Sequence, residues 1–194
     1  MLLAPQLAVN ASDSSAGKFW EPFGFAKFMG DAVPHLARMY GDPKSKTTFA
    51  TMPIIVVAYS GGYVPAAWAL HRGGAEWRIV GVVLLDALYG ETEKYASFIK
   101  RRRNAFFISS YTSSTAGGNA SLKSLLATRS IPVEESRTGL PRNLQGRVSF
   151  LPGLPNAGHH DFVTRAWTEM PIKDVLDRLP QYSRAPSRSA EVRR

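Results

Sequence analysis

Four short apolar runs constrain the fold of this chain more than any other feature. Each is rich in β-branched or aromatic side chains and lacks a strict alternation of polar residues: 52–59 (MPIIVVAY), 79–85 (IVGVVLL), 105–109 (AFFIS) and 147–151 (RVSFL). Runs of this kind are typical of strands that are buried on both faces of a parallel sheet. The shorter run from Leu2 to Ala4, stopped by Pro5, is expected to be the end of a further strand.

Helical patterns lie between these runs. They cover 25–40, 63–70, 91–103, 122–127 and 162–179, and Pro171 either begins a new helix or bends the last one. The alternation predicts an α/β fold, with a mostly parallel sheet flanked by helices. One domain is expected over 1–180. The remainder, 181–194, is rich in Ser, Pro and Arg and is predicted to be a disordered basic tail.

The formal charge of +9 raises the question of a nucleic-acid partner. Four of these charges lie in Lys100–Arg103, and the tail from Gln181 to Arg194 adds a net three. Neither stretch carries the interleaved aromatic residues of a base-stacking surface. Both are typical of solvated basic surface, and no specific nucleic-acid partner is predicted.

The cellular location is predicted from three features that the sequence lacks. No apolar run approaches the ~20 residues of a membrane-spanning helix. Met1–Gln6 lacks the basic start and long apolar stretch of a secretory signal. The chain has no cysteine, which excludes disulfides, thiolate nucleophiles and cysteine-bound metals. A cytoplasmic location with no membrane span is therefore predicted.

Ser60 stands directly after the strand predicted at 52–59 and before a predicted helix. Small residues surround it, with Ala58 before it and Gly61 and Gly62 after it. A serine on a sharp strand-to-helix turn needs such neighbours because the flanking chain passes very close. The amide of Gly61 would then point at an oxyanion. The alternative role is a helix N-cap in a glycine-rich loop, and the position between strand and helix favours the nucleophile.

The segment 54–70 (IIVVAYSGGYVPAAWAL) resembles the nucleophile elbow of the α/β-hydrolase superfamily. The later segments LLDALYG and GHHDFV are also similar to segments of that superfamily and come in the same order. The resemblance covers about 2–179 and is greatest to bacterial members. It implies a three-layer α/β-hydrolase-like sandwich and a serine hydrolase whose catalytic residues follow the chain order serine, acid, histidine.

A serine hydroxyl needs a base to take its proton. His35 and His71 precede the acid candidates or lie in predicted helices, whereas His159 and His160 follow the last strand in a loop. One of this pair is expected to be the base. His159 is favoured because the histidine of the family often opens a short polar stretch before an apolar helix.

Asp86 ends the strand predicted at 79–85, where a carboxylate is well placed for function in an open sheet. The acid of the family commonly follows the next strand, but 104–132 contains neither Asp nor Glu. Asp86 is therefore predicted to be the acid, with capping of the turn near Ala87 as its alternative role. Asp161 is expected to be a helix N-cap.

These assignments predict an acyl hydrolase with a small-molecule ester or related substrate. Ser60 would attack, His159 would act as base, Asp86 would hold the imidazole, and no metal or organic cofactor is expected. The segment 10–20 is expected to lie over the site. Phe19, Trp20 and Tyr63 are either substrate-pocket residues or plain core residues.

The chain departs from the family pattern at its N-terminal side. The family has a strand between those represented here by 2–4 and 52–59, and the loop after it supplies a second oxyanion amide. Either the sheet is truncated or it has closed up without that strand. Loss of one oxyanion donor costs roughly 2.7–4 kcal/mol of transition-state stabilisation. The alternative function is therefore a weak or inactive domain that binds ligands or partners, and an exposed strand edge would favour a homo-oligomer.

Overall fold

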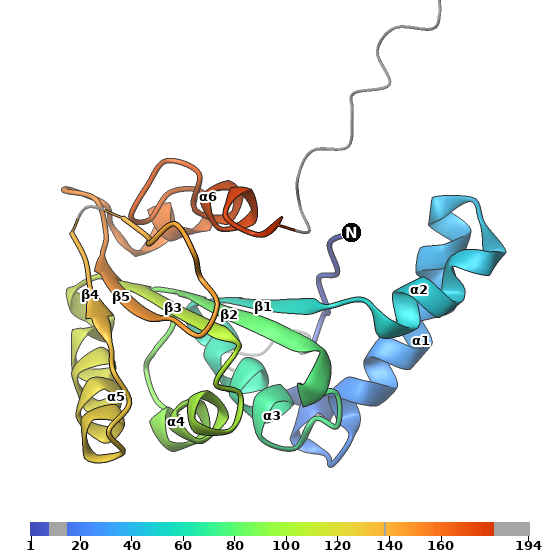
Figure 1. Ribbon diagram of the computed structural model, residues 1–194, viewed down its shortest axis with the longest axis horizontal. Helices are drawn as coiled ribbons and strands as arrows, with labels where there is room; N and C mark the ends of the chain where they lie inside the picture. The colour runs from blue at the N-terminus through green and yellow to red at the C-terminus, as the bar shows by residue number, and fades with distance from the viewer. Residues whose placement is uncertain (8–14, 138, 181–194) are drawn as a thin grey trace, which may run out of the picture.

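The computed structural model describes residues 1–7, 15–137 and 139–180 and has an α/β fold (Figure 1). Its five strands are all parallel and lie in the order β1-β2-β3-β5-β4. The strands are β1 (Ile54–Tyr59), β2 (Ile79–Leu85), β3 (Phe106–Tyr111), β4 (Glu134–Glu135) and β5 (Val148–Pro152). Each of the four apolar runs overlaps one of them, and β3 and β5 extend one or two residues beyond their runs. The two-residue β4 was not predicted, because so short a strand carries no pattern.

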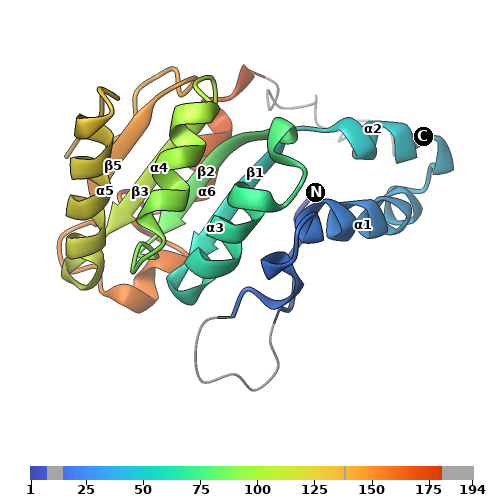
Figure 2. The ribbon, with the colours of Figure 1, turned by 90° about the horizontal axis from the view of Figure 1, so that it is seen from below.

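Helices cover both faces of the sheet (Figures 1 and 2). They are α1 (Gly24–Tyr40), α2 (Lys46–Thr51), α3 (Tyr63–Arg72), α4 (Thr92–Arg101), α5 (Ala116–Thr128) and α6 (Pro171–Asp177). In Figure 1, α3, α4 and α5 lie below the sheet and α6 lies above it. Pro171 begins α6, as one of the two alternatives expected. The predicted α/β class with helices flanking a parallel sheet is confirmed.

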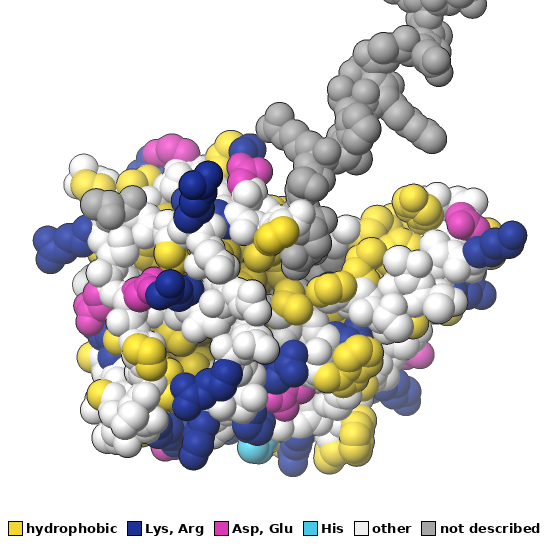
Figure 3. All heavy atoms as spheres, in the orientation of Figure 1, with side chains coloured by type: hydrophobic (Ala, Val, Ile, Leu, Met, Phe, Trp, Pro, Cys, Tyr) yellow, Lys and Arg dark blue, Asp and Glu magenta, His cyan; other side chains and the backbone are white. Residues whose placement is uncertain are grey.

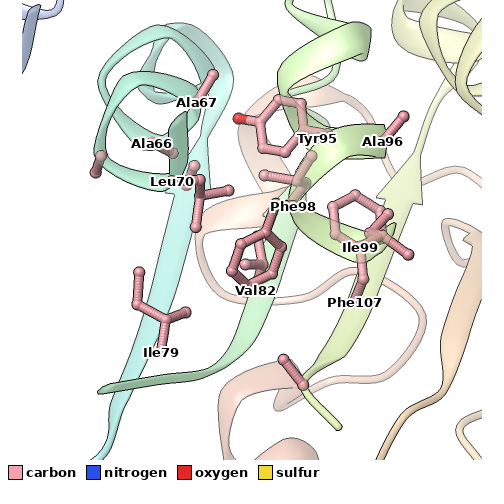
Figure 4. Packing of buried hydrophobic residues seen from close by; sticks show 14 of the residues in the cluster. Ala66, Ala67, Leu70, Ile79, Val82, Tyr95, Ala96, Phe98, Ile99 and Phe107 are labelled. Carbon is pink, nitrogen blue, oxygen red and sulfur yellow. The ribbon is translucent and has the colours of Figure 1, made fainter. Parts of the chain in front are cut away.

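Two apolar cores lie on the two faces of the sheet. Val82 and Phe107 pack on the α3–α4 face, with Leu70 and Phe98 from those helices (Figure 4). Their strand neighbours point the other way, so that Val83 joins the core beneath α6. This alternation buries β2 almost completely, as expected for a central strand with helices on both sides.

The strand β1 lies at the edge of the sheet and is only half covered. Among the described residues it pairs with β2 alone, and Val57 remains 44% exposed. The prediction of a strand at Leu2–Ala4 is wrong, because this segment forms no ladder and Leu3 instead packs near Phe49. Three apolar residues followed by a proline, which cannot donate to a ladder, give little basis for a strand.

Helices α1 and α2 extend beyond the β1 edge of the sheet (Figure 1). Arg78, a side chain only 8% exposed that lies just before β2, joins these helices to the sheet, and Phe25 and Met29 of α1 also pack in the core on the α3–α4 face. The guanidinium donates to the carbonyl of Phe49 at 2.7 Å and to that of Met52 at 3.0 Å and 3.1 Å. Burial lowers the pKa of Arg78 below its ordinary value.

The basic stretch Lys100–Arg103 ends α4 and is partly engaged in local contacts. Arg101 pairs with Glu76 at 3.1 Å, and Arg102 donates to the carbonyl of Trp77 at 3.0 Å. Figure 3 shows Lys and Arg side chains spread over one face of the molecule, with Asp and Glu among them. The predicted basic tail, 181–194, lies outside the described residues. None of the helices in the described ranges combines the length and apolar composition needed to cross a membrane.

Candidate active site

Ser60 lies on a sharp turn between β1 and α3. Its φ is +51°, in the left-handed region that residues other than glycine rarely adopt. A Cβ added at Gly62 would lie 3.5 Å from the Cβ of Ala58, an ordinary van der Waals contact, so these two small residues lie next to each other at the turn. Small residues on both sides of Ser60 thus allow the backbone to turn, and backbone strain of this kind is often found at functional sites.

His159 joins Ser60 to Asp86. Its Nε2 lies 2.9 Å from the Ser60 Oγ, and its Nδ1 lies 2.7 Å from the Asp86 Oδ2. The imidazole begins a 3₁₀ turn, His159–Val163, and stays 25% exposed. The carboxylate of Asp161 accepts a hydrogen bond from the Gly158 amide at 2.8 Å, which closes this turn. The N-cap of the turn is Gly158, so the expectation that Asp161 is the N-cap is wrong, and Asp161 supports the turn from its third position.

The neighbouring His160 is exposed, and its ring meets the ring of His159 edge-on at 5.7 Å. Of the two histidines that the sequence left as candidates, the structure brings only His159 into contact with Ser60 and Asp86. This separation follows from the start of the 3₁₀ turn, because consecutive side chains on a helical turn point in different directions.

Asp86 is fully buried at the end of β2, with a φ of +44°. It accepts hydrogen bonds from the Thr112 amide at 2.9 Å, the Thr112 hydroxyl at 2.9 Å and the Thr115 hydroxyl at 2.5 Å. Burial by itself raises the pKa of this carboxyl. The hydrogen bonds that it accepts, led by that of the Thr112 amide, outweigh burial and hold the pKa below its ordinary value.

These threonines are the functional residues that the sequence analysis missed. They belong to the polar stretch 112–115 (TSST), which directly follows β3. The stretch contains no carboxylate, but its hydroxyl groups can donate hydrogen bonds to one. The network continues inward, since Asn119 donates to the carbonyl of Thr115 at 2.8 Å and accepts from Ser109 at 2.6 Å. A run of hydroxyl side chains at the carboxyl end of a buried strand was the signal available.

Tyr89 lies beside the imidazole of His159 and meets its ring edge-on. The Tyr89 hydroxyl is 3.4 Å from the Nδ1 of His159, and its ring packs 5.9 Å from that of Tyr63. Burial and then the negative charge of Asp86 raise the pKa of Tyr89 above its ordinary value. Tyr63 thus contacts a neighbour of the imidazole, and its role as a substrate-pocket residue stays a prediction.

The other two predicted pocket residues lie elsewhere. Phe19 is 5% exposed and packs edge-on against Phe25 and Phe28, which corrects its assignment to an open pocket and leaves the core role. Trp20 is 54% exposed and stacks on Trp68 in α3 at 4.4 Å. Of the segment 10–20 that is expected to cover the site, residues 10–14 lie outside the described residues.

A cavity of about 360 Å³ opens beside the network instead, at the ends of β3 and β5. Its lining consists of Tyr111, Thr112, Ser113, Ala116, Pro152, Gly153, Leu154 and Ala157. Thr112 both lines this cavity and donates to Asp86, whereas Ser60 is not among the lining residues.

The geometry defines what the linked side chains can do. With Nδ1 donating to the Asp86 carboxylate, Nε2 presents a lone pair to the Ser60 hydroxyl. A hydroxyl held by an imidazole, which is oriented in turn by a buried carboxylate, can act as a nucleophile. Within the described residues, no cluster of three His, Asp or Glu side chains could hold a metal ion.

Comparisons of this chain with protein-family models, with curated proteins and with solved structures found no match. The functional assignment therefore depends on the three linked side chains and on their surroundings.

Proposed function

We propose that this protein is a serine hydrolase with an α/β-hydrolase-like three-layer fold that cleaves an ester or a related acyl bond. The observation that carries the proposal is the chain of two contacts, 2.9 Å from Ser60 to His159 and 2.7 Å from His159 to Asp86. Both distances are within hydrogen-bonding range, and the serine lies on a left-handed strand-to-helix turn.

In the first half of the reaction, the Ser60 oxygen forms a bond to the substrate carbonyl carbon while its proton passes to the Nε2 of His159. The Gly61 amide stabilises the negative charge on the carbonyl oxygen. The bond to the leaving group then breaks, and the leaving group takes the proton from His159.

In the second half, water attacks the acyl-Ser60 ester and gives a proton to His159. The bond from the acyl carbon to the Ser60 oxygen breaks, and this oxygen regains the proton. Asp86 stays ionised throughout and stabilises the imidazolium in each half. Its lowered pKa fits this role, because the carboxylate remains charged at neutral pH.

The alternative is a weak or inactive domain that binds ligands or partners. It is favoured by the position of β1, since the described residues place no strand beside the nucleophile strand where the family has one. A cytoplasmic location and a homo-oligomer also remain predictions. The two functions differ in the reactivity of Ser60.

Labelling by a fluorophosphonate probe tests the proposal. The wild-type chain should be labelled at Ser60, and Ser60→Ala and His159→Ala should abolish or nearly abolish labelling. His160→Ala is the matched control, because its ring is adjacent but exposed, and it should label at close to the wild-type rate. Circular dichroism would establish that each variant is folded.

A folded wild-type chain that is not labelled would contradict the hydrolase and support the binding domain. Loss of labelling in His160→Ala but not in His159→Ala would reassign the base. For a chain that does label, an initial burst of alcohol from a chromogenic ester, in proportion to the chain concentration, would identify the acyl-enzyme.

A further inference from the structure

The imidazole of His159 lies against an aromatic face. The ring of Tyr59 stacks on it with 4.9 Å between centroids and 26° between the planes. Tyr89 and His160 meet the same imidazole edge-on, at 74° and 67°. Tyr59 is therefore the neighbour whose face covers the ring of His159, while Ser60 and Asp86 hold its two nitrogens.

The backbone explains how Tyr59 reaches this place. It is the last residue of β1 and pairs with Leu85, the last residue of β2. Ser60 follows Tyr59, and Asp86 follows Leu85. Because the two strands end side by side, the proposed nucleophile, the proposed acid and the stacked ring lie close together. Tyr59 also packs against the core beneath α6, which limits the movement of its side chain.

A ring in this position has two effects on the base. It restricts rotation of the imidazole about the line between Ser60 and Asp86. It also favours the imidazolium, because a cation is attracted to the face of an aromatic ring by about 0.5–1 kcal/mol at a partly exposed site. The imidazolium forms only when His159 takes the serine proton, so this attraction stabilises the reacting state more than the resting state.

We propose that Tyr59 is a positioning residue for His159 that holds the plane of the imidazole and stabilises its protonated form. This inference rests on the proposed hydrolase function. The titratable groups that face His159 are Asp86 from the end of β2, Tyr89 from the loop after it and His160 from its own turn. All three remain in a variant of Tyr59, so a comparison with wild type isolates the ring.

The test compares Tyr59→Leu with Tyr59→Phe. Leucine keeps apolar cover over the imidazole but removes the aromatic face, whereas phenylalanine keeps the face and removes only the hydroxyl. Tyr111→Leu is the matched control, because Tyr111 is the last residue of β3 and lies at the same end of the sheet. Labelling rates would be measured from pH 5 to pH 9.

We expect Tyr59→Leu to label about two- to fivefold more slowly than wild type. The acid limb of its labelling profile should move to lower pH by about half a unit, because the imidazolium loses its aromatic partner. Tyr59→Phe and Tyr111→Leu should stay within about twofold of wild type and keep the wild-type profile. A wild-type rate and profile in Tyr59→Leu would overturn the proposal.

Proton NMR of the histidine ring gives a readout that does not require activity. In wild type and Tyr59→Phe, the carbon-bound protons of His159 should be shifted upfield by the stacked ring, and this shift should disappear in Tyr59→Leu. A wild-type chain that does not label would contradict the hydrolase. In that case the NMR spectra still test the stacking. Unchanged His159 resonances in Tyr59→Leu would show that the ring of Tyr59 does not stack on the imidazole.

Discussion

The two ends of β2 each carry a buried charge, but only one of them can take part in chemistry. Arg78 lies just before the strand and is 8% exposed, and Asp86 follows it and is fully buried. Both charges are hydrogen-bonded, as burial of an ion requires. The partners differ. Arg78 donates to the backbone carbonyls of Phe49 and Met52, which do not titrate.

Asp86 accepts hydrogen bonds from two threonines, which do not titrate, and also contacts the imidazole of His159. His159 is also partly exposed, so it can exchange protons with a substrate or with water. A buried charge surrounded only by backbone carbonyls therefore anchors chain segments. A buried carboxylate that contacts a titratable and partly exposed side chain can stabilise that side chain when it takes up a proton.

The largest effect that separates the two ends is expected for Asp86→Asn. The amide cannot stabilise an imidazolium and favours the wrong tautomer of His159, so fluorophosphonate labelling should fall by about 10⁴-fold. The variant should stay folded, because the threonine hydroxyls can rotate to suit the amide. Labelling above a tenth of the wild-type rate would mean that Asp86 does not orient the base.

Arg78→Met should show the opposite pattern. Two carbonyls lose their donor, and each buried carbonyl left unpaired costs about 1–3 kcal/mol, so the free energy of unfolding in urea should fall by about 2–6 kcal/mol. The labelling rate per folded chain should remain that of wild type. A large fall in labelling without a fall in stability would contradict the purely structural role assigned to Arg78.

A matched pair of glycines tests how tightly the carboxyl end is packed. A Cβ added at Gly118 in α5 would lie 1.8 Å from the carbonyl oxygen of Leu88, whereas one at Gly117 meets nothing within 4 Å. Gly118→Ala should lower the free energy of unfolding by about 1–3 kcal/mol, and Gly117→Ala should raise it by up to about 1 kcal/mol. Equal urea midpoints for the two variants would show that α5 can move without cost.

The smallest expected effect is on how the stability of the fold depends on pH. The pKa of Asp86 lies below its ordinary value of 3.8 in the folded chain, so its ionisation stabilises the fold above that value. This contribution should be lost as the pH falls from about 4 through the pKa of the folded state. Urea midpoints of wild type and Arg78→Met should show this loss, and those of Asp86→Asn should lack it. A loss of the same size in Asp86→Asn would assign it to other carboxyl groups.

Much of the backbone structure around the site could be predicted from local sequence. The run IIVVAY predicts a strand and the small residues after it predict a turn, because β-branched preference and close backbone approach act over a few neighbouring residues. The structure places Ser60 on that turn and Asp86 after the next strand. The helix α2 and the two-residue β4 were missed, because elements this short bury too few side chains to leave a pattern.

Other features depend on contacts between distant parts of the chain. Phe19 and Trp20 are adjacent aromatic residues, yet one is buried in the core and the other is 54% exposed. Likewise, no local pattern indicates that Thr112 and Thr115 hold Asp86, since they are 26 and 29 residues away from it. These partners are set by the register of β2 against β3, which depends on packing over the whole sheet.

The sequence by itself determined the α/β class, the strand-to-helix turn at Ser60 and the pair of histidines from which a base could come. Only the tertiary structure decided that His159 rather than His160 meets Ser60, 99 residues away, and Asp86, 73 residues away. Strand and turn preferences act between neighbours in the chain. The contacts of a side chain with partners this distant are fixed only when the sheet and the helices on both its faces have packed together.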